Sequence, residues 1–182
     1  MYLGARWMAP LSQRMIPVPV PGLDRTRLAC AGAGDVARAR LVAGPVDAVA
    51  LRSAYAAAAA ELRALRAVEG WPDPVAPPEE HRLAGAGPLV LLSAREVPLA
   101  RIAGLLIAGA GRGLIWKPAP GAAASAHSLM RALAPGVGAG LALVQGDHAT
   151  GALAAGQGAV IWASDAPPPA GLAVSLCVPA TG

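Results

Sequence analysis

Few side chains in this sequence could act as nucleophiles. The two cysteines, Cys30 and Cys177, lie far apart and match no metal-binding or redox spacing, so we expect reduced thiols. No Lys, Arg or His stands within ten residues of Cys177, so nothing nearby in the sequence would activate its thiol. We therefore expect Cys177 to be a buried, unreactive strand cysteine rather than a nucleophile.

The three histidines, His81, His127 and His148, lack the spacing of metal ligands, and we expect no metal site. His148 lies in the segment Gly146-Asp147-His148-Ala149-Thr150, which is typical of a turn after a strand. Asp147 or Thr150 is expected to cap the helix that follows this turn, which leaves His148 as a surface or turn residue.

Lys117 follows the apolar segment 113–116 and precedes a proline. Two interpretations of its amine stay open: a solvated cation beside a sheet, or a contact to a ligand. If the segment is a parallel strand, Lys117 stands at its carboxyl end, where open α/β sheets bind ligands.

Alternating strand and helix patterns would position these residues. Short apolar strands are expected at 88–93, 113–116, 140–145, 159–163 and 173–178. Helices are expected between them at 99–110, 122–134 and 150–155. Strands that alternate with helices of this length predict a Rossmann-like α/β fold, a parallel sheet with helices on both faces.

The first part of the chain has a different pattern. Residues 1–30 alternate apolar and polar side chains, which predicts short strands or a hairpin with a turn at Pro21-Gly22. Residues 31–70 predict a short helix capped by Asp35 and a longer alanine-rich helix at 45–68. We interpret residues 1–182 as one domain whose Rossmann-like core is 85–182.

The length of 182 residues fits one domain, with 55% hydrophobic and 14% charged residues. The net charge of +4 comes from scattered cations without interleaved aromatic residues, which argues against nucleic-acid binding. The apolar run 102–115 is too short to span a bilayer, and the N-terminus lacks a signal-peptide core. We expect a cytoplasmic protein that binds neither nucleic acid nor membrane.

Segments along nearly the whole chain, in order, resemble the aldehyde dehydrogenase superfamily. MYLGARWMAPLSQRMIPVPVPG is similar to the opening strands of that family, and AGAGDV to the start of its first helix. GAGPLVLLSAREVPLARIAGLLIAGAGRGLIWKPAP resembles its "G-v-v-g-v-I-s-P-W-N-F-P-l" strand and loop, the next helix and the "G-n-t-v-V-l-K-P" strand. LALVQGDHATGALAAGQGAVIWASD resembles "lnvvtGdgatGaaLvahpgvdkvaFTGS". The resemblance implies a shortened relative of the NAD(P)-binding domain.

The resemblance also implies that the catalytic residues of the family are lost. The nucleophilic cysteine of the family lies in a catalytic domain that we expect to be missing. Glu96 takes the place of the asparagine that stabilises the oxyanion, and a carboxylate there repels negative charge. VSLCVPATG is similar to the "v-t-l-E-l-G-G" strand, which puts Cys177 where the general-base glutamate stands.

The implied cofactor is NAD or NADP. Lys117 and Pro118 match the K-P motif, whose lysine hydrogen-bonds the adenosine ribose in the family, and Ser164 stands in the stretch that matches the phosphate-binding G-S-T-x-x-G turn. Three successive prolines, at 167–169, follow Ser164 and supply no N–H donors for a pyrophosphate, which makes tight dinucleotide binding doubtful.

Two functions follow from this reading. The first is a non-catalytic module for binding, oligomerisation or regulation, with a second copy of itself or a full-length aldehyde dehydrogenase subunit as the partner. The alternative is an NAD(P)-binding, oxidoreductase-type subunit of an aldehyde dehydrogenase. An active chain would fall in the NAD(P)-dependent aldehyde dehydrogenase class.

Overall fold

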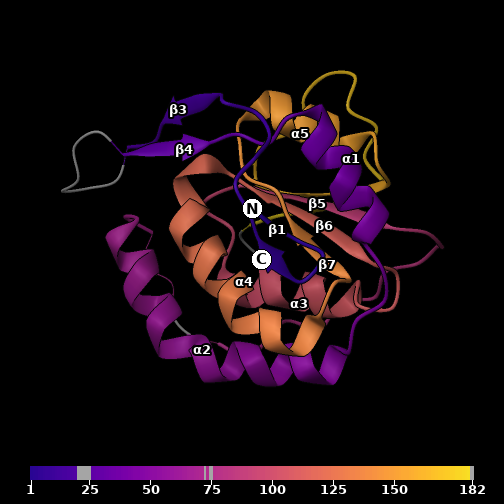
Figure 1. Ribbon diagram of the computed structural model, residues 1–182. Coiled ribbons are helices and arrows are strands. Elements are labelled where there is room, and N and C mark those ends of the chain that lie inside the picture. The colour runs from indigo at the N-terminus through magenta and orange to yellow at the C-terminus, as the bar shows by residue number, and fades with distance from the viewer. Residues whose placement is uncertain (20–25, 72, 74–75, 181–182) are drawn as a thin grey trace.

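A seven-stranded sheet forms the centre of the protein in the computed structural model, which describes residues 1–19, 26–71, 73 and 76–180 (Figure 1). Its strand order is β2-β1-β7-β6-β5-β8-β9. The strands are β1 (Tyr2–Leu3), β2 (Arg6–Trp7), β5 (Leu89–Ser93), β6 (Leu114–Pro118), β7 (Leu141–Leu143), β8 (Ala159–Ala163) and β9 (Leu176–Val178). A separate two-stranded sheet pairs β3 (Met15–Pro17) with β4 (Arg27–Ala29).

The strands from β5 onward confirm the predicted parallel sheet. β5 pairs in parallel with both β6 and β8, β6 with β7, and β8 with β9. The two N-terminal strands make the sheet mixed, because β1 runs antiparallel to β7 and β2 antiparallel to β1. The predicted N-terminal strands and hairpin are confirmed, while the predicted turn at Pro21-Gly22 lies outside the described residues.

Helices cover both faces of the sheet, as predicted (Figure 1). They are α1 (Ala33–Val42), α2 (Ala48–Val68), α3 (Leu99–Ala108), α4 (Ala123–Val137) and α5 (His148–Ala155), with a 3-10 turn η1 (Pro120–Ala122) before α4. α2, α3 and α4 pack together on one face, and α1 and α5 lie on the other (Figure 1).

Alternation along the strands separates two apolar cores. Leu91 and Trp116 belong to the core under α2, α3 and α4, whereas Leu92 and Ile115 belong to the core under α1 and α5. Because side chains in a strand alternate between faces, Lys117 points to the same side as Ile115. The only lysine of the sequence therefore lies on the α5 side of the sheet.

The predicted cap of the first helix needs a correction. Asp35 does not stand at the N-cap, because α1 begins two residues earlier and Gly32 is its N-cap. The Asp35 carboxylate instead accepts hydrogen bonds from the backbone N–H of Gly32 at 3.0 Å and of Leu11 at 3.0 Å. Asp35 thus closes the helix start from its third position and ties it to the N-terminal segment.

A buried charge network fixes the loop after β5. Arg66, only 2% exposed, donates from Nη2 to the backbone oxygen of Arg95 at 2.7 Å. Its Nη1 lies 3.6 Å from Glu69, which also accepts two backbone N–H groups at the start of α4. Asp73 lies 4.0 Å from Arg66 Nε and accepts the first N–H of α3 at 2.6 Å. The network thereby joins α2, α3, α4 and the loop that carries Glu96.

Candidate functional site

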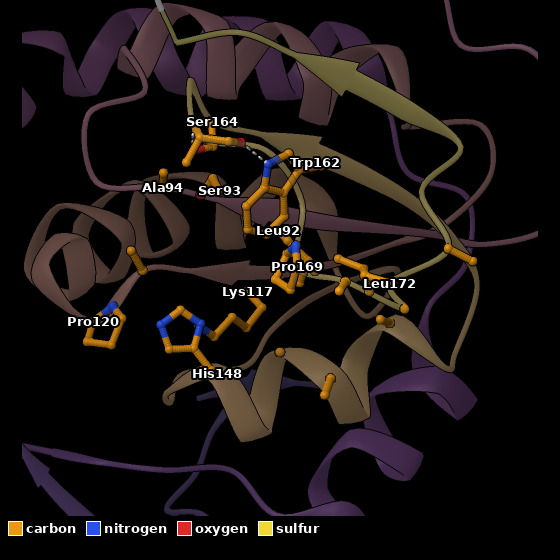
Figure 2. Close-up of a pocket in the computed structure, with 18 of the residues that line it drawn as sticks. Leu92, Ser93, Ala94, Lys117, Pro120, His148, Trp162, Ser164, Pro169 and Leu172 are labelled. Atoms are coloured by element: carbon orange, nitrogen blue, oxygen red, sulfur yellow. Dashed lines mark hydrogen bonds between the residues drawn. The ribbon is translucent and has the colours of Figure 1, made fainter.

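A pocket of about 810 Å³ opens between α5 and the carboxyl ends of β5, β6 and β8 (Figure 2). This volume is within the range of small-molecule sites. Leu92, Trp162 and Leu172 supply large apolar walls. The titratable or hydroxyl groups come from Lys117, Glu96, His148, Ser93 and Ser164. The pocket therefore lies where parallel α/β sheets bind their ligands.

The connection from β8 to β9 forms one wall of the pocket. It contains no helix: residues 164–175 are bends, turns and extended chain, and Pro169 lines the pocket. Gly171 in this connection has a φ of +81°, a conformation that suits glycine. A pyrophosphate beside residues 164–175 would therefore find no helix N-terminus in this connection.

Lys117 is the buried cation of this pocket. The residue is 7% exposed, and its side chain extends from β6 toward the space above α5 (Figure 2). Within the part of the chain that the structure describes, its amine has neither a hydrogen-bond acceptor nor an ion-pair partner. Burial lowers the pKa of Lys117 to about 8, while Asp147 and Cys30 act in the opposite direction.

Small residues of α5 make room for this lysine. Gly151, Ala152 and Ala155 of the helix and its C-cap Gly156 all line the pocket. A Cβ at Gly151 would touch the Lys117 stem at 3.9 Å, so the helix approaches the lysine closely at this point. The sequence analysis treated this stretch only as helix, and the small-residue pattern on one helix face was the signal that it missed.

The N-terminus of α5 is already occupied by a carboxylate. Asp147 is its N-cap, as predicted, and accepts the N–H of Thr150 at 3.2 Å. Both terminal guanidinium nitrogens of Arg14 donate to the Asp147 carboxylate, Nη2 at 3.0 Å. The hydrogen bond from Arg14 holds the pKa of Asp147 at about 2, so the carboxylate stays ionised. This helix end is therefore no free anion site.

Glu96 and Ser164 meet at the edge of the pocket. The Ser164 hydroxyl donates to Glu96 Oε1 at 3.1 Å and accepts the backbone N–H of Ala166 at 3.1 Å. Both residues also line the pocket. The structure thus brings together Lys117, Ser164 and Glu96, three of the residues that the sequence singled out, and Glu96 presents an acceptor where the resembled family has a donor.

The expected burial of Cys177 is wrong. Cys177 is exposed, because it lies on β9, the strand at the edge of the sheet. Among the described residues no further strand pairs with β9. Cys177 pairs with Trp162 across the two strands but does not line the pocket. Cys30 is buried and also lies outside the pocket lining.

The remaining candidate residues are dispersed. Pro118 ends β6 and does not line the pocket, although its neighbour Lys117 does. His148 is at the pocket, whereas the His127 ring lies against Trp7 at 4.1 Å between centroids and His81 lies 3.7 Å from Glu79. The described residues hold no group of three or more potential metal ligands.

The parallel strands, their covering helices and a ligand-sized pocket at the carboxyl edge define the Rossmann-like class of α/β folds. Comparison with solved structures narrows this class to the fold of the aldehyde dehydrogenases, as the sequence predicted. An aldehyde dehydrogenase from Mycobacterium tuberculosis, complexed with NAD⁺, has 21% identity and a TM-score of 0.69. Aldehyde dehydrogenase C from Pseudomonas syringae, complexed with NAD⁺ and octanal, has 18% identity and a TM-score of 0.71.

These matches cover most of this chain but less than half of the other proteins. Each covers 90% of this chain, with 46% of the Mycobacterium tuberculosis protein and 44% of the Pseudomonas syringae protein. An aldehyde dehydrogenase from Bartonella henselae matches over the same 90% of this chain and 46% of its own length, with 13% identity and a TM-score of 0.71. No protein-family model and no curated protein matches the sequence.

Among the described residues, each helix is too short or too polar to cross a membrane.

Proposed function

We propose that this chain is a non-catalytic binding module with the aldehyde dehydrogenase fold, and that its pocket holds the adenosine part of NAD⁺ or NADP⁺. The observation that supports this is the pocket itself, with a buried and unpartnered Lys117 among apolar walls. The related structures from Mycobacterium tuberculosis and Pseudomonas syringae were solved with NAD⁺, which makes this nucleotide the first candidate ligand.

Three features of the pocket support binding without aldehyde oxidation. Neither described cysteine lines it, so it offers no thiol to attack an aldehyde. Glu96 supplies a carboxylate at its edge, which would oppose an oxyanion. The connection after β8 gives a pyrophosphate no helix N-terminus. We therefore assign the binding energy to the adenosine part alone.

Calorimetric titration with NAD⁺, NADP⁺ and AMP tests this proposal. If the pyrophosphate and nicotinamide contribute little, NAD⁺ and AMP bind with Kd values within about threefold of each other, a difference below about 1 kcal/mol. Ala155→Leu, which fills the pocket from α5, weakens both at least about tenfold. Absence of heat at millimolar nucleotide, or equal binding by Ala155→Leu, would refute the proposal.

An activity assay tests the non-catalytic part. Octanal and NAD⁺ mixed with the protein are expected to give no NADH absorbance above the protein-free control. Sustained NADH formation that depends on the protein would contradict it.

The proposed partner is a second copy of the chain or a full-length aldehyde dehydrogenase subunit. The support is that large apolar side chains such as Leu41, Val49 and Leu176 are exposed, at 83%, 73% and 38%. Size-exclusion chromatography with multi-angle scattering, alone and with such a subunit, is expected to show a mass above that of the 18.0 kDa chain. A monomeric mass that stays unchanged when the subunit is added would contradict the proposed partner.

A further inference from the structure

Every α-helix in the described part of the chain has a carboxylate of the chain itself at its start. The N-caps Asp47 and Asp147 accept N–H groups at the start of α2 and α5. Asp73 accepts the first N–H of α3, and Glu69 accepts two N–H groups of α4. Asp35 lies in the first turn of α1 and accepts the N–H of its N-cap residue. Because a phosphate binds a helix start through free N–H groups and the helix dipole, these carboxylates compete with it at each helix.

The pocket beside α5 is also poor in cations. Arginine, which suits phosphate best, makes up all but one of the 15 Lys and Arg residues, yet none of the described arginines lines the pocket. Arg14 reaches the start of α5 but is held there by Asp147. The described lining therefore brings one amine, one imidazole and one carboxylate, from Lys117, His148 and Glu96. A phosphate in this pocket would face the Glu96 carboxylate without a guanidinium to offset it.

The walls of the pocket suit an uncharged ring system that carries hydroxyl groups. Trp162 lines the pocket, and its indole is held in place because Nε1 donates to the backbone oxygen of Ala166 at 2.7 Å (Figure 2). An indole held in this way offers a purine an aromatic surface for stacking. The hydroxyls of Ser93 and Ser164 and the amine of Lys117 also line the pocket, and all three can form hydrogen bonds with ribose hydroxyls.

We propose that the pocket selects an adenine nucleoside that carries no phosphate, and that Glu96 sets this selectivity by repelling a phosphate. The inference rests on the proposed adenosine binding and narrows its ligand class from nucleotides to nucleosides. Glu96 is suited to this role because the Ser164 hydroxyl donates to its Oε1 at 3.1 Å and keeps the carboxylate at the pocket edge. Two negative charges that share a partly buried pocket repel each other more strongly than they would in water.

Calorimetric titration at pH 8 with adenosine, AMP and methylthioadenosine tests the inference. AMP adds a charged phosphate to the ribose, whereas methylthioadenosine adds an uncharged group at the same carbon and so controls for bulk. We expect adenosine to bind at least about tenfold more tightly than AMP, and methylthioadenosine to bind within about threefold of adenosine. An equal loss of affinity for methylthioadenosine and AMP would show that bulk, not charge, sets the selectivity, and would overturn the inference.

Two variants test the role of the Glu96 charge. Glu96→Gln keeps the shape of the side chain and an oxygen that can accept the Ser164 hydrogen bond, but it removes the charge. The ratio of AMP Kd to adenosine Kd should then fall below about threefold. The matched control is Glu80→Gln, which removes the same charge from an exposed residue outside the pocket lining and should leave the ratio unchanged. An unchanged ratio in Glu96→Gln that unfolds at the wild-type temperature would overturn the inference.

The outcomes separate this inference from the nucleotide proposal. If AMP binds as tightly as adenosine, the inference is overturned and the nucleotide proposal stands. If adenosine gives heat while AMP and NAD⁺ give none at millimolar concentration, the inference is supported and the nucleotide proposal is overturned. If adenosine gives no heat, the pocket does not select a nucleoside and the inference is overturned.

Discussion

Two buried cations in this chain stand in opposite environments. Arg66 is 2% exposed and lies among Glu69, Asp73 and a backbone oxygen at 2.7 Å. Lys117 is 7% exposed and has no such partner in the described part of the chain. A buried charge with fixed partners holds structure together, whereas one without them weakens the fold unless it serves a ligand. The difference separates the side of the sheet under α2, α3 and α4, where the buried cation is paired, from the α5 side, where we propose that a ligand binds.

Removing a partner of the paired cation is expected to change the free energy of unfolding most. Glu69→Ala removes a carboxylate that contacts Arg66 and accepts two N–H groups at the start of α4, and it leaves a buried guanidinium uncompensated. The free energy of unfolding should fall by about 3–5 kcal/mol in denaturant titrations. The matched control is Glu61→Ala, whose pair with Arg131 is solvent-exposed and which should cost under about 1 kcal/mol. Equal losses would contradict the comparison.

Removing the unpaired cation is expected to raise the free energy of unfolding at pH 7 instead of lowering it. The pKa of Lys117 is lowered in the folded chain, so the unfolded chain binds more protons between about pH 8 and 10.5, and stability rises with pH in that window. Lys117→Met abolishes this rise and should stabilise the protein at pH 7 by up to about 3 kcal/mol. Urea unfolding at pH 7 and pH 10 measures both. A destabilised Lys117→Met at pH 7 would show that the amine has a structural partner.

The smallest expected effect on stability concerns Asp147, the carboxylate at the start of α5 that acts on Lys117. Asp147→Ala removes the N-cap of α5, and thermal unfolding should show a loss of about 1 kcal/mol. Since Asp147 raises the pKa of Lys117, the variant should also titrate its lysine at a lower pH than the wild type. A higher lysine pKa in Asp147→Ala would contradict the electrostatic account of the pocket.

The sequence predicted the sheet well because its signals are local. The strand at 159–163 has the bounds expected from its apolar run, and the carboxyl-end position of Lys117 followed from the alternating pattern. The exposure of Cys177 was missed because it depends on which strand ends the sheet, a property of topology rather than of neighbouring residues. The sequence also could not show that Lys117 lacks an ion pair, because pairing depends on residues that are far apart in the chain. Asp147, the carboxylate that acts on Lys117, is bound by Arg14 from 133 positions away.

One titration tests the central claim most directly. Protein labelled with ¹³C at the lysine ε carbon gives a single lysine signal, because the sequence contains one lysine. The account predicts that this signal titrates with a midpoint near pH 8, the pKa to which burial lowers Lys117. A midpoint near 10.5, the ordinary value, would show a solvated or paired amine. That result would contradict both the buried, unpaired Lys117 of the proposed ligand pocket and its contrast with Arg66.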